Sequence, residues 1–174
     1  MIKFTKQKKT QVEKLYNKIL LLSRNKVFYT KFCLNDTFQN RISLIFLHIS
    51  FLFIKLKQKN KNELYKGFSQ LTFDLIFKKI ELNMREIGYG DTFVNKKMKL
   101  LVKTFYNILL SCENYGSKSL KSKYSFLLKY LTLNSDKNCS SNTDMIAYFN
   151  KYQTFCFDLS SDSVLSGELK FNYK

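Results

Sequence analysis

The sequence predicts an all-α protein: a single helical-bundle domain of about five to seven helices, followed by a poorly defined C-terminal tail. Three observations predict this class. The 174 residues include no proline, so few positions forbid a long helix. Apolar residues make up 45% of the chain, which is enough for a sizeable core in one domain. Apolar side chains also recur every three or four residues along several segments, which is the period of an amphipathic helix.

The N-terminal third is expected to hold two helices. The first covers residues 11–24, and a loop over residues 25–36 follows it. Asp36 or Thr37 is expected to cap the second helix, because a short side-chain oxygen can accept from a free backbone N–H of the first turn. This second helix, residues 38–57, is apolar on nearly every side, so it should run through the middle of the domain.

The most apolar stretch of the chain lies inside this central helix, over residues 42–56. It is shorter than the roughly 20 residues that a helix needs to cross a bilayer, so we interpret it as a buried core helix. His48, the only histidine, lies within it. A hydrogen-bonded core histidine is the first interpretation, and an axial haem ligand is the alternative.

Two longer helices are expected next, over residues 63–87 and about 93–113. Between them, either Gly88 or Gly90 suits the left-handed position that ends a helix. The side chain of Asp91 or Thr92 then suits the N-cap of the following helix.

The last third of the sequence is less regular. Residues 122–133 predict a short helix, residues 134–144 a polar loop, and residues 145–159 either a helix or an extended piece. The remaining residues are expected to be mobile. The domain organisation we expect is therefore a helical domain over residues 10–116, additional helices packing on it over 117–157, and a flexible tail over 158–174.

Charge points to anionic partners. The formal net charge is +17, which should attract RNA, a ribosome surface or anionic lipid. The alternative is a lysine face that is merely solvated. Only three of the 30 basic residues are arginine, which argues against bidentate phosphate recognition, and we expect no specific DNA binding.

Few residues could support catalysis or bind a metal. With one histidine and no CxxC pair, a zinc site is poorly supported, and the four cysteines are interpreted as reduced thiols. No nucleophile–base set can be named, so we predict neither an enzyme nor a cofactor. The N-terminal residues MIKFTKQKKTQVEK have neither the apolar region of a secretory signal nor the composition of a mitochondrial transit peptide.

Six local patterns in order resemble one family. They are LNDT at 34–37 before Arg41, LHISFLFIKL at 47–56, FDLIF at 73–77, MREIGYGD at 84–91, NKKMK at 95–99 and FYN at 105–107. Together they closely resemble the ubiquinol–cytochrome c chaperone domain over residues 12–116. The sequence departs from the family pattern at Asn35, where a proline is usual, and at Asn107 and Ile108, where the family often has Gly-Arg.

The resemblance implies an all-helical, non-enzymatic assembly factor for the cytochrome bc1 complex. Its expected partners are nascent cytochrome b, the ribosome near its tunnel exit, a small partner chaperone and an anionic membrane that it contacts peripherally. It also implies a cytoplasmic protein at the inner membrane of an alphaproteobacterium, or alternatively a protein of the mitochondrial matrix.

We expect the binding residues to gather around the turn between the two long helices and on the basic face that follows it. The candidates for docking of a client or of the ribosome match the family motifs or the basic stripe; they are Arg41, Arg85, Glu86, Asp91, Lys96, Lys97, Lys99 and Lys103. The competing interpretation assigns the carboxylates to helix pairing and capping, and the lysines to a solvated face.

Overall fold

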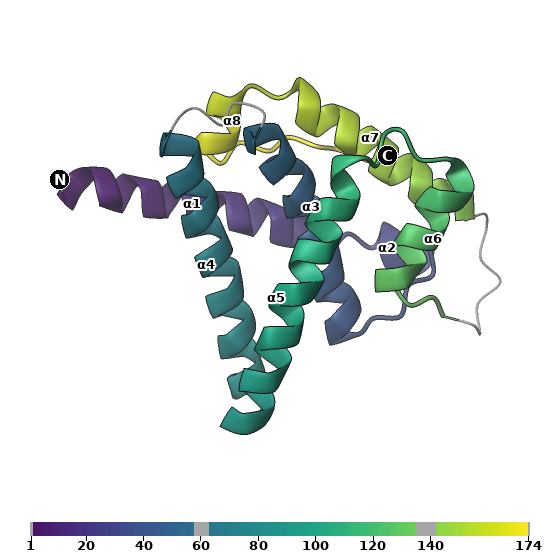
Figure 1. Cartoon of the computed structure of the whole chain (residues 1–174), viewed down its shortest axis with the longest axis horizontal. Coiled ribbons are helices and arrows are strands. Elements are labelled where there is room, and N and C mark those ends of the chain that lie inside the picture. The colour runs from purple at the N-terminus through teal and green to yellow at the C-terminus, as the bar shows by residue number, and fades with distance from the viewer. Residues whose placement is uncertain (1, 58–62, 135–141, 174) are drawn as a thin grey trace.

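The structure is a computed structural model that describes residues 2–57, 63–134 and 142–173. Within these residues the chain is helical, with six long helices and two short ones, which confirms the predicted all-α bundle (Figure 1). The helices are α1 (Ile2–Ser23), α2 (Val27–Thr30), α3 (Phe38–Lys57), α4 (Glu63–Glu86), α5 (Asp91–Glu113), α6 (Leu120–Tyr130), α7 (Asn142–Asp158) and α8 (Ser161–Leu165).

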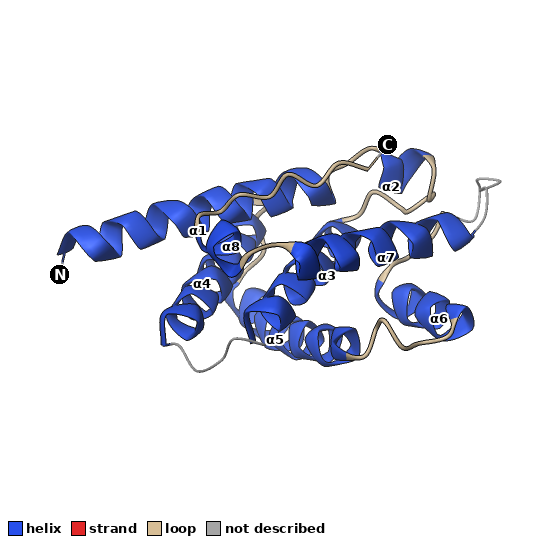
Figure 2. Ribbon diagram, turned by 90° about the horizontal axis from the view of Figure 1, so that it is seen from above, coloured by secondary structure: helices blue, strands red, loops and turns tan. Residues whose placement is uncertain are grey.

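Helix α3 is the central helix, as its sequence predicts. It packs against α1, α4, α5, α7 and α8, so apolar side chains all round its circumference are buried. Figure 2 shows it between α1 on one side and α5 on the other. Among the described residues, no helix is both long enough and apolar enough to cross a membrane.

His48 in the middle of α3 is a hydrogen-bonded core histidine. Its Nδ1 lies 2.6 Å from the Leu44 carbonyl oxygen and its Nε2 lies 2.8 Å from the Tyr148 hydroxyl. Because a carbonyl can only accept, Nδ1 carries the proton and Nε2 accepts from Tyr148. Burial lowers the pKa of this imidazole to about 4, and both ring nitrogens already have partners.

Helices α4 and α5 form an antiparallel hairpin that projects beyond the other helices in Figure 1. Gly88 has a φ of +98° and so takes the predicted left-handed position after α4. The N-cap prediction is wrong, since Gly90 occupies the N-cap of α5 without a side-chain hydrogen bond. Asp91 is instead the first residue of α5, where its carboxylate bonds to Arg85 across the turn.

The N-terminal region contains more helix than its pattern predicts. Helix α1 begins at Ile2, whereas the sequence predicts a start near residue 11. The first turns were missed because the lysine-rich segment before residue 11 lacks the apolar period on which the prediction depends. The predicted loop contains α2, a single turn anchored by the buried ring of Phe28. Thr37 caps α3 as predicted, with its Oγ1 3.2 Å from the Asn40 backbone nitrogen.

The chain after α5 folds back onto the same core. Residues 145–159 were predicted to be either a helix or an extended piece, and residues 145–158 are helical. They belong to α7, which packs on α3 and α6. Of the predicted loop 134–144, residues 135–141 lie outside the described residues, and residues 142–144 are not loop but the start of α7. Cys112 and Cys156 are free, as expected, and both are buried, but Cys33 is disulfide-bonded, so the expectation of a reduced thiol is wrong there. The fourth cysteine, Cys139, lies outside the described residues.

The C-terminal segment, expected as a flexible tail, is packed over its described residues. Helix α8 buries Val164, and the chain beyond it buries Leu169 and Phe171. Gly167 allows the close approach to α1, because its φ is +73° and an added Cβ would lie 2.8 Å from the Gln11 carbonyl oxygen. Leu169 and Phe171 alternate with a polar residue, and their side chains are buried in the core rather than solvated.

Candidate functional site

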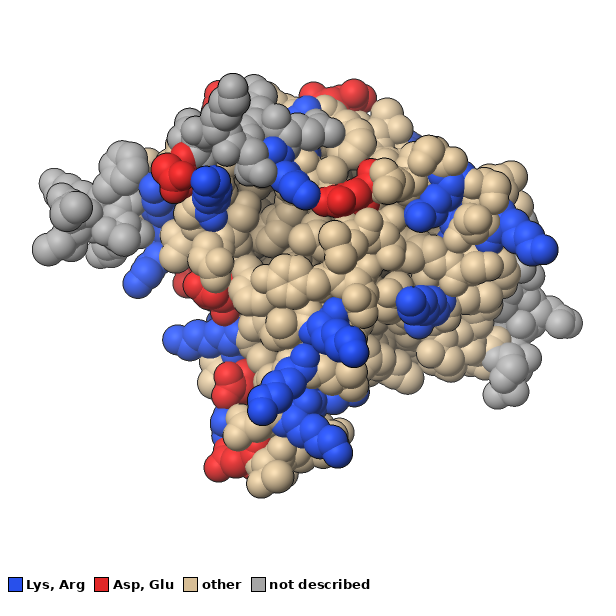
Figure 3. Space-filling view, in the orientation of Figure 1, with Lys and Arg blue, Asp and Glu red and all other residues tan. Residues whose placement is uncertain are grey.

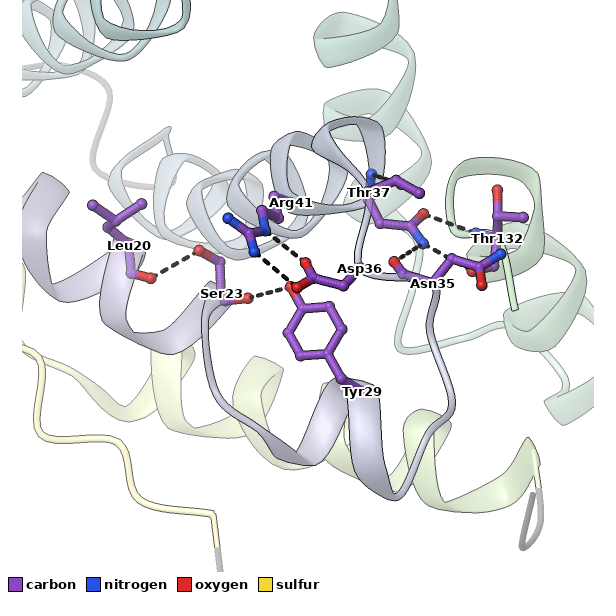
Figure 4. Close-up of polar contacts among 9 residues, drawn as sticks. Leu20, Ser23, Tyr29, Asn35, Asp36, Thr37, Arg41 and Thr132 are labelled. Carbon is purple, nitrogen blue, oxygen red and sulfur yellow. Dashed lines mark hydrogen bonds and ion pairs between the residues drawn. The ribbon is translucent and has the colours of Figure 1, made fainter. Parts of the chain in front are cut away.

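The loop that leads into α3 holds Arg41 in a fixed position. The Arg41 guanidinium donates to both carboxylate oxygens of Asp36, at 2.7 Å and 2.8 Å (Figure 4). This bidentate hydrogen bond lowers the pKa of Asp36. The Tyr29 hydroxyl lies beside the pair and bonds to the Ser23 carbonyl oxygen at 3.4 Å, which links α2 to the end of α1.

A second polar cluster beside this ion pair was not identified from the sequence. The Asn40 side chain is fully buried, donates to the carbonyl oxygens of Asn35 and Thr132 at 2.7 Å and 2.8 Å, and accepts from the Thr132 backbone N–H at 2.9 Å. Asn35 donates its own backbone N–H to the Thr132 carbonyl oxygen at 3.0 Å. A proline at position 35 could not make that bond, so the asparagine has a structural reason.

The turn between α4 and α5 is closed by ion pairs. Arg85 bonds to Glu81 one turn earlier at 3.0 Å and to Asp91 across the turn. The bond to Asp91 and then that to Glu81 raise the pKa of Arg85 above its ordinary value. Arg85 and Asp91 are therefore together, as their place in one motif suggests, and both are engaged in holding the turn.

The lysines of the predicted basic stripe lie along one side of α5, facing away from the core. Lys96, Lys99 and Lys103 are exposed, and Lys97 is half-buried at the edge of the same side. Within residues 2–57, 63–134 and 142–173, none of the four has an acidic partner. Figure 3 shows basic side chains over the α5 part of the hairpin and acidic ones along its α4 edge.

Large apolar side chains lie exposed among these lysines. Phe93, Leu100, Tyr106 and Leu110 of α5 are each at least half exposed. Ile87 and Tyr89 in the turn are exposed too, and the Tyr89 ring stacks on Phe93 with the centroids 4.7 Å apart. Six of the ten exposed large apolar side chains in the described part of the chain thus lie between residues 87 and 110.

We call the exposed side of this helix the α5 outer face; its members are Phe93, Lys96, Lys99, Leu100, Lys103, Tyr106 and Leu110. The lysines were predicted as binding residues from the sequence, but the apolar residues between them were not. The available signal was the spacing of Phe93, Lys96 and Leu100, which follow one another after three and four residues. That spacing places two apolar residues on the same side of the helix as a lysine. Several large apolar side chains exposed on one side of a helix are typical of a binding surface.

An aromatic groove adjoins the α5 outer face. It has a volume of about 270 Å³ and lies between the end of α3, the start of α4 and the C-terminal half of α5. Its walls include the rings of Phe53, Tyr65, Phe73 and Phe105, and Tyr106 belongs both to the groove and to the α5 outer face. A groove lined by several rings and open to solvent can accommodate apolar side chains of another polypeptide.

A separate hollow lies between α1, α3 and α4, with a volume of about 340 Å³. Arg41 and Glu86, two predicted binding residues from distant parts of the sequence, both line it, together with Arg24. We call it the Arg24–Arg41 hollow. The eight predicted residues therefore occupy three places: the hollow, the ion-paired turn and the lysine side of α5.

The described residues offer no evident centre for catalysis or metal binding. Among them, no three His, Cys, Asp or Glu side chains cluster as metal ligands. The buried thiols of Cys112 and Cys156 have raised pKa values because of desolvation, so neither is an activated nucleophile.

The sequence matches a family of chaperones over most of its length. The ubiquinol–cytochrome c chaperone family model matches residues 30–171, which is most of the chain. The chain belongs to the ubiquinol–cytochrome c chaperone family. The match continues past residue 116, so the resemblance extends into the C-terminal helices, where the sequence motifs gave no signal.

Among solved structures, the chain is similar to a crystal structure of the Cbp3 homolog from Brucella abortus. The two share 22% sequence identity with a TM-score of 0.80, over 98% of this chain and 93% of the other. At this identity the likeness concerns the fold, which the two share over nearly their whole length. Among curated proteins, none matches this chain significantly.

Proposed function

We propose that this chain is a non-enzymatic assembly chaperone that binds newly made cytochrome b and assists assembly of the ubiquinol–cytochrome c reductase (bc1) complex. Family membership is the observation that carries the proposal. A chaperone of this kind needs a surface for apolar polypeptide and no reaction centre. The exposed apolar side chains of α5 and the adjoining aromatic groove are consistent with that need.

The aromatic groove and the α5 outer face are our candidate for the client surface. A membrane protein that has not yet inserted exposes apolar helices, and such a helix binds an apolar groove through side chains spaced along one face. Tyr106 belongs to both the groove and the α5 outer face and is half exposed. A client helix would therefore contact Tyr106 whether it lies in the groove or on the α5 outer face.

The further partners we propose follow the same family role. They are the ribosome near its tunnel exit, where nascent cytochrome b emerges, and a small partner chaperone. The place of action would be the cytoplasmic side of the inner membrane in an alphaproteobacterium, or the mitochondrial matrix, with peripheral contact to anionic lipid. The unpaired lysines of α5 support contact with an anionic surface in either compartment.

The test is recovery of cytochrome b with the tagged full-length protein from its own cells, after cross-linking and washing at low and high salt. We expect cytochrome b to persist at high salt, because an apolar complex is weakly screened. Tyr106→Glu should reduce recovery several-fold, whereas Leu128→Glu, at an exposed leucine of α6, should not. Absence of cytochrome b at both salt concentrations would contradict the proposal.

A second candidate function is favoured by the charge alone: a basic protein associated with the ribosome, RNA or a membrane surface. The net charge of +17 and the unpaired lysines of α5 support it. Binding driven by phosphate contacts falls steeply between low and moderate salt. Recovery of ribosomal proteins alone, lost at high salt, would favour this candidate, and flotation with anionic but not neutral liposomes would favour its membrane form.

A further inference from the structure

The Arg24–Arg41 hollow is a second concave surface, and no residue of α5 or of the aromatic groove lines it. Its floor is apolar and includes Leu20 from α1, Ile42 from α3 and Ile80 from α4. Charged side chains from α4 and from the ends of α1 and α3 surround this floor. A concave apolar floor with a few charged groups at its edge is the usual form of a specific binding site.

The arginines are concentrated here. The chain has 27 lysines but only three arginines, and two of those three line this one hollow. Lysine would supply positive charge equally well. Arginine differs because its planar guanidinium donates two parallel hydrogen bonds to a carboxylate. Arg41 is held in place by Asp36, so one side of the hollow is preorganised.

Arg24 is the available cation. It is exposed directly after the last residue of α1, and its side chain makes no hydrogen bond or ion pair within the described residues. Its positive charge nevertheless acts on the hydroxyls of Tyr16 and Tyr29, where it opposes the rise in pKa that burial causes. Arg24 itself lines the hollow, so an incoming carboxylate could reach its guanidinium.

The opposite edge of the hollow carries Glu86 and Ile87. Glu86 is exposed and unpaired within the described residues, and Ile87 is 61% exposed. The negative charge of Glu86 disfavours an anionic membrane surface or a nucleic acid, which would bring phosphates to both edges. Ile87 extends the apolar floor outward, so the surface suits the side of a helix better than a small molecule.

We propose that the Arg24–Arg41 hollow binds a helical segment of a second polypeptide that presents an apolar side chain beside a carboxylate. The apolar side chain lies on the floor formed by α1, α3 and α4. The carboxylate pairs with Arg24, and Glu86 accepts a hydrogen bond from a basic or N–H group at the other edge. This surface is separate from the proposed client surface and does not depend on the client being cytochrome b.

The test begins with a photo-cross-linking amino acid, p-benzoylphenylalanine, at Ile87 of the full-length protein in its own cells. The same amino acid at Leu128 is the control, since that leucine is exposed on α6. The cross-linked segment is sequenced and synthesised, and its affinity for the purified full-length protein is measured by fluorescence anisotropy. We expect a segment with Asp or Glu within one helical turn of an apolar residue.

Charge reversal then tests the pairing. Arg24→Glu should weaken binding about tenfold, and a peptide with its carboxylate changed to Lys should restore the affinity of this variant. Lys18→Glu is the matched control, because Lys18 is exposed on α1, the helix that Arg24 directly follows, and the charge change is equal. Both variants should keep the melting temperature of the parent protein, since neither side chain has a partner to lose among the described residues.

Four results would overturn the inference. They are no cross-linking at Ile87 above the Leu128 control, cross-linking to lipid or nucleic acid only, a captured segment without a carboxylate, and unchanged affinity in Arg24→Glu. Recovery of cytochrome b is measured separately. If one of these four results is obtained while cytochrome b is still recovered with the tagged protein, the hollow is rejected as a docking site. The proposed function then remains supported.

Discussion

At the scale of single residues, buried polar side chains fix how distant segments meet. Asn40 bonds to the backbone on both sides of an interface between residues 35 and 132, and His48 bonds to Tyr148 on α7. Each group is fully buried and fully engaged. Removing Asn40 would leave the Thr132 backbone N–H without its partner, and removing His48 would leave the buried Tyr148 hydroxyl without one. Such an unpaired group costs more than the bond itself contributes.

We expect Asn40→Ala to destabilise the protein by about 1–3 kcal/mol, because it leaves the Thr132 backbone N–H without its partner and removes one of the two donors to each of the Asn35 and Thr132 carbonyl oxygens. Urea unfolding followed by circular dichroism measures the change. Gln39→Ala is the control, since Gln39 is the neighbouring half-buried residue and its side chain has no partner among those described. A loss below about 1 kcal/mol would show that the network contributes little.

His48 should make stability depend on pH. Its pKa is about 4 in the folded protein, so the unfolded chain, with a pKa near 6.5, binds the proton more readily. Stability due to this group is therefore complete above about pH 6.5 and is lost as the pH falls towards 4. We expect a loss of about 2 kcal/mol between pH 7 and pH 5 that is absent in His48→Gln. Equal pH dependence in both proteins would contradict this assignment.

At the scale of elements, α5 has two sides with different residues: one side packs against the core and the other is exposed. One side buries Val94, Leu101, Phe105, Ile108 and Cys112 against the core. The other, the α5 outer face, combines lysines with exposed apolar side chains. Exposed apolar side chains add nothing to folding, so stability alone does not explain this side.

Reversing Lys96, Lys97 and Lys99 to Glu should weaken association with ribosomes or anionic liposomes while the helical content stays unchanged. The lysines have no acidic partner in the described part of the chain, so their reversal breaks no ion pair there. Co-sedimentation and liposome flotation measure the association. The control reverses three exposed lysines elsewhere, Lys18, Lys79 and Lys121, with the same change in net charge. Equal behaviour of the two triple variants would mean that net charge alone matters.

At the scale of the whole molecule, the C-terminal segment closes the bundle over α1. Gly167 lies against the α1 backbone, and the residues after it bury Leu169 and Phe171 in the same core as the N-terminal helices. The two ends of the described chain therefore stabilise one another. The family match, which reaches residue 171, includes this segment.

Gly167→Ala should destabilise the whole protein by about 1–3 kcal/mol, because a Cβ would meet the Gln11 carbonyl oxygen and the backbone is left-handed at this residue. Gly67→Ala is the matched control. Gly67 lies inside α4 with open space around it, so alanine there should stabilise the protein by about 0.5–1 kcal/mol. Thermal unfolding of both variants checks the signs, and a neutral Gly167→Ala would argue against close docking of this segment.

The sequence by itself determined the helical class, the central position of α3, the bounds of α4 and α5 to within two residues, and the family. It could do so because apolar periodicity and glycine punctuation are local signals. It also identified Arg85 and Asp91, which lie six residues apart in one motif and bond across the turn.

Only the tertiary structure decided which surfaces exist. The Arg24–Arg41 hollow unites side chains from α1, α3 and α4, and the aromatic groove unites α3, α4 and α5, so neither has a sequence spacing that could reveal it. The packing of the C-terminal segment was not predicted from the sequence for the same reason. Its few apolar residues are too short a pattern to predict burial, and they are buried because a glycine lets the chain lie against a helix that begins more than 150 residues earlier.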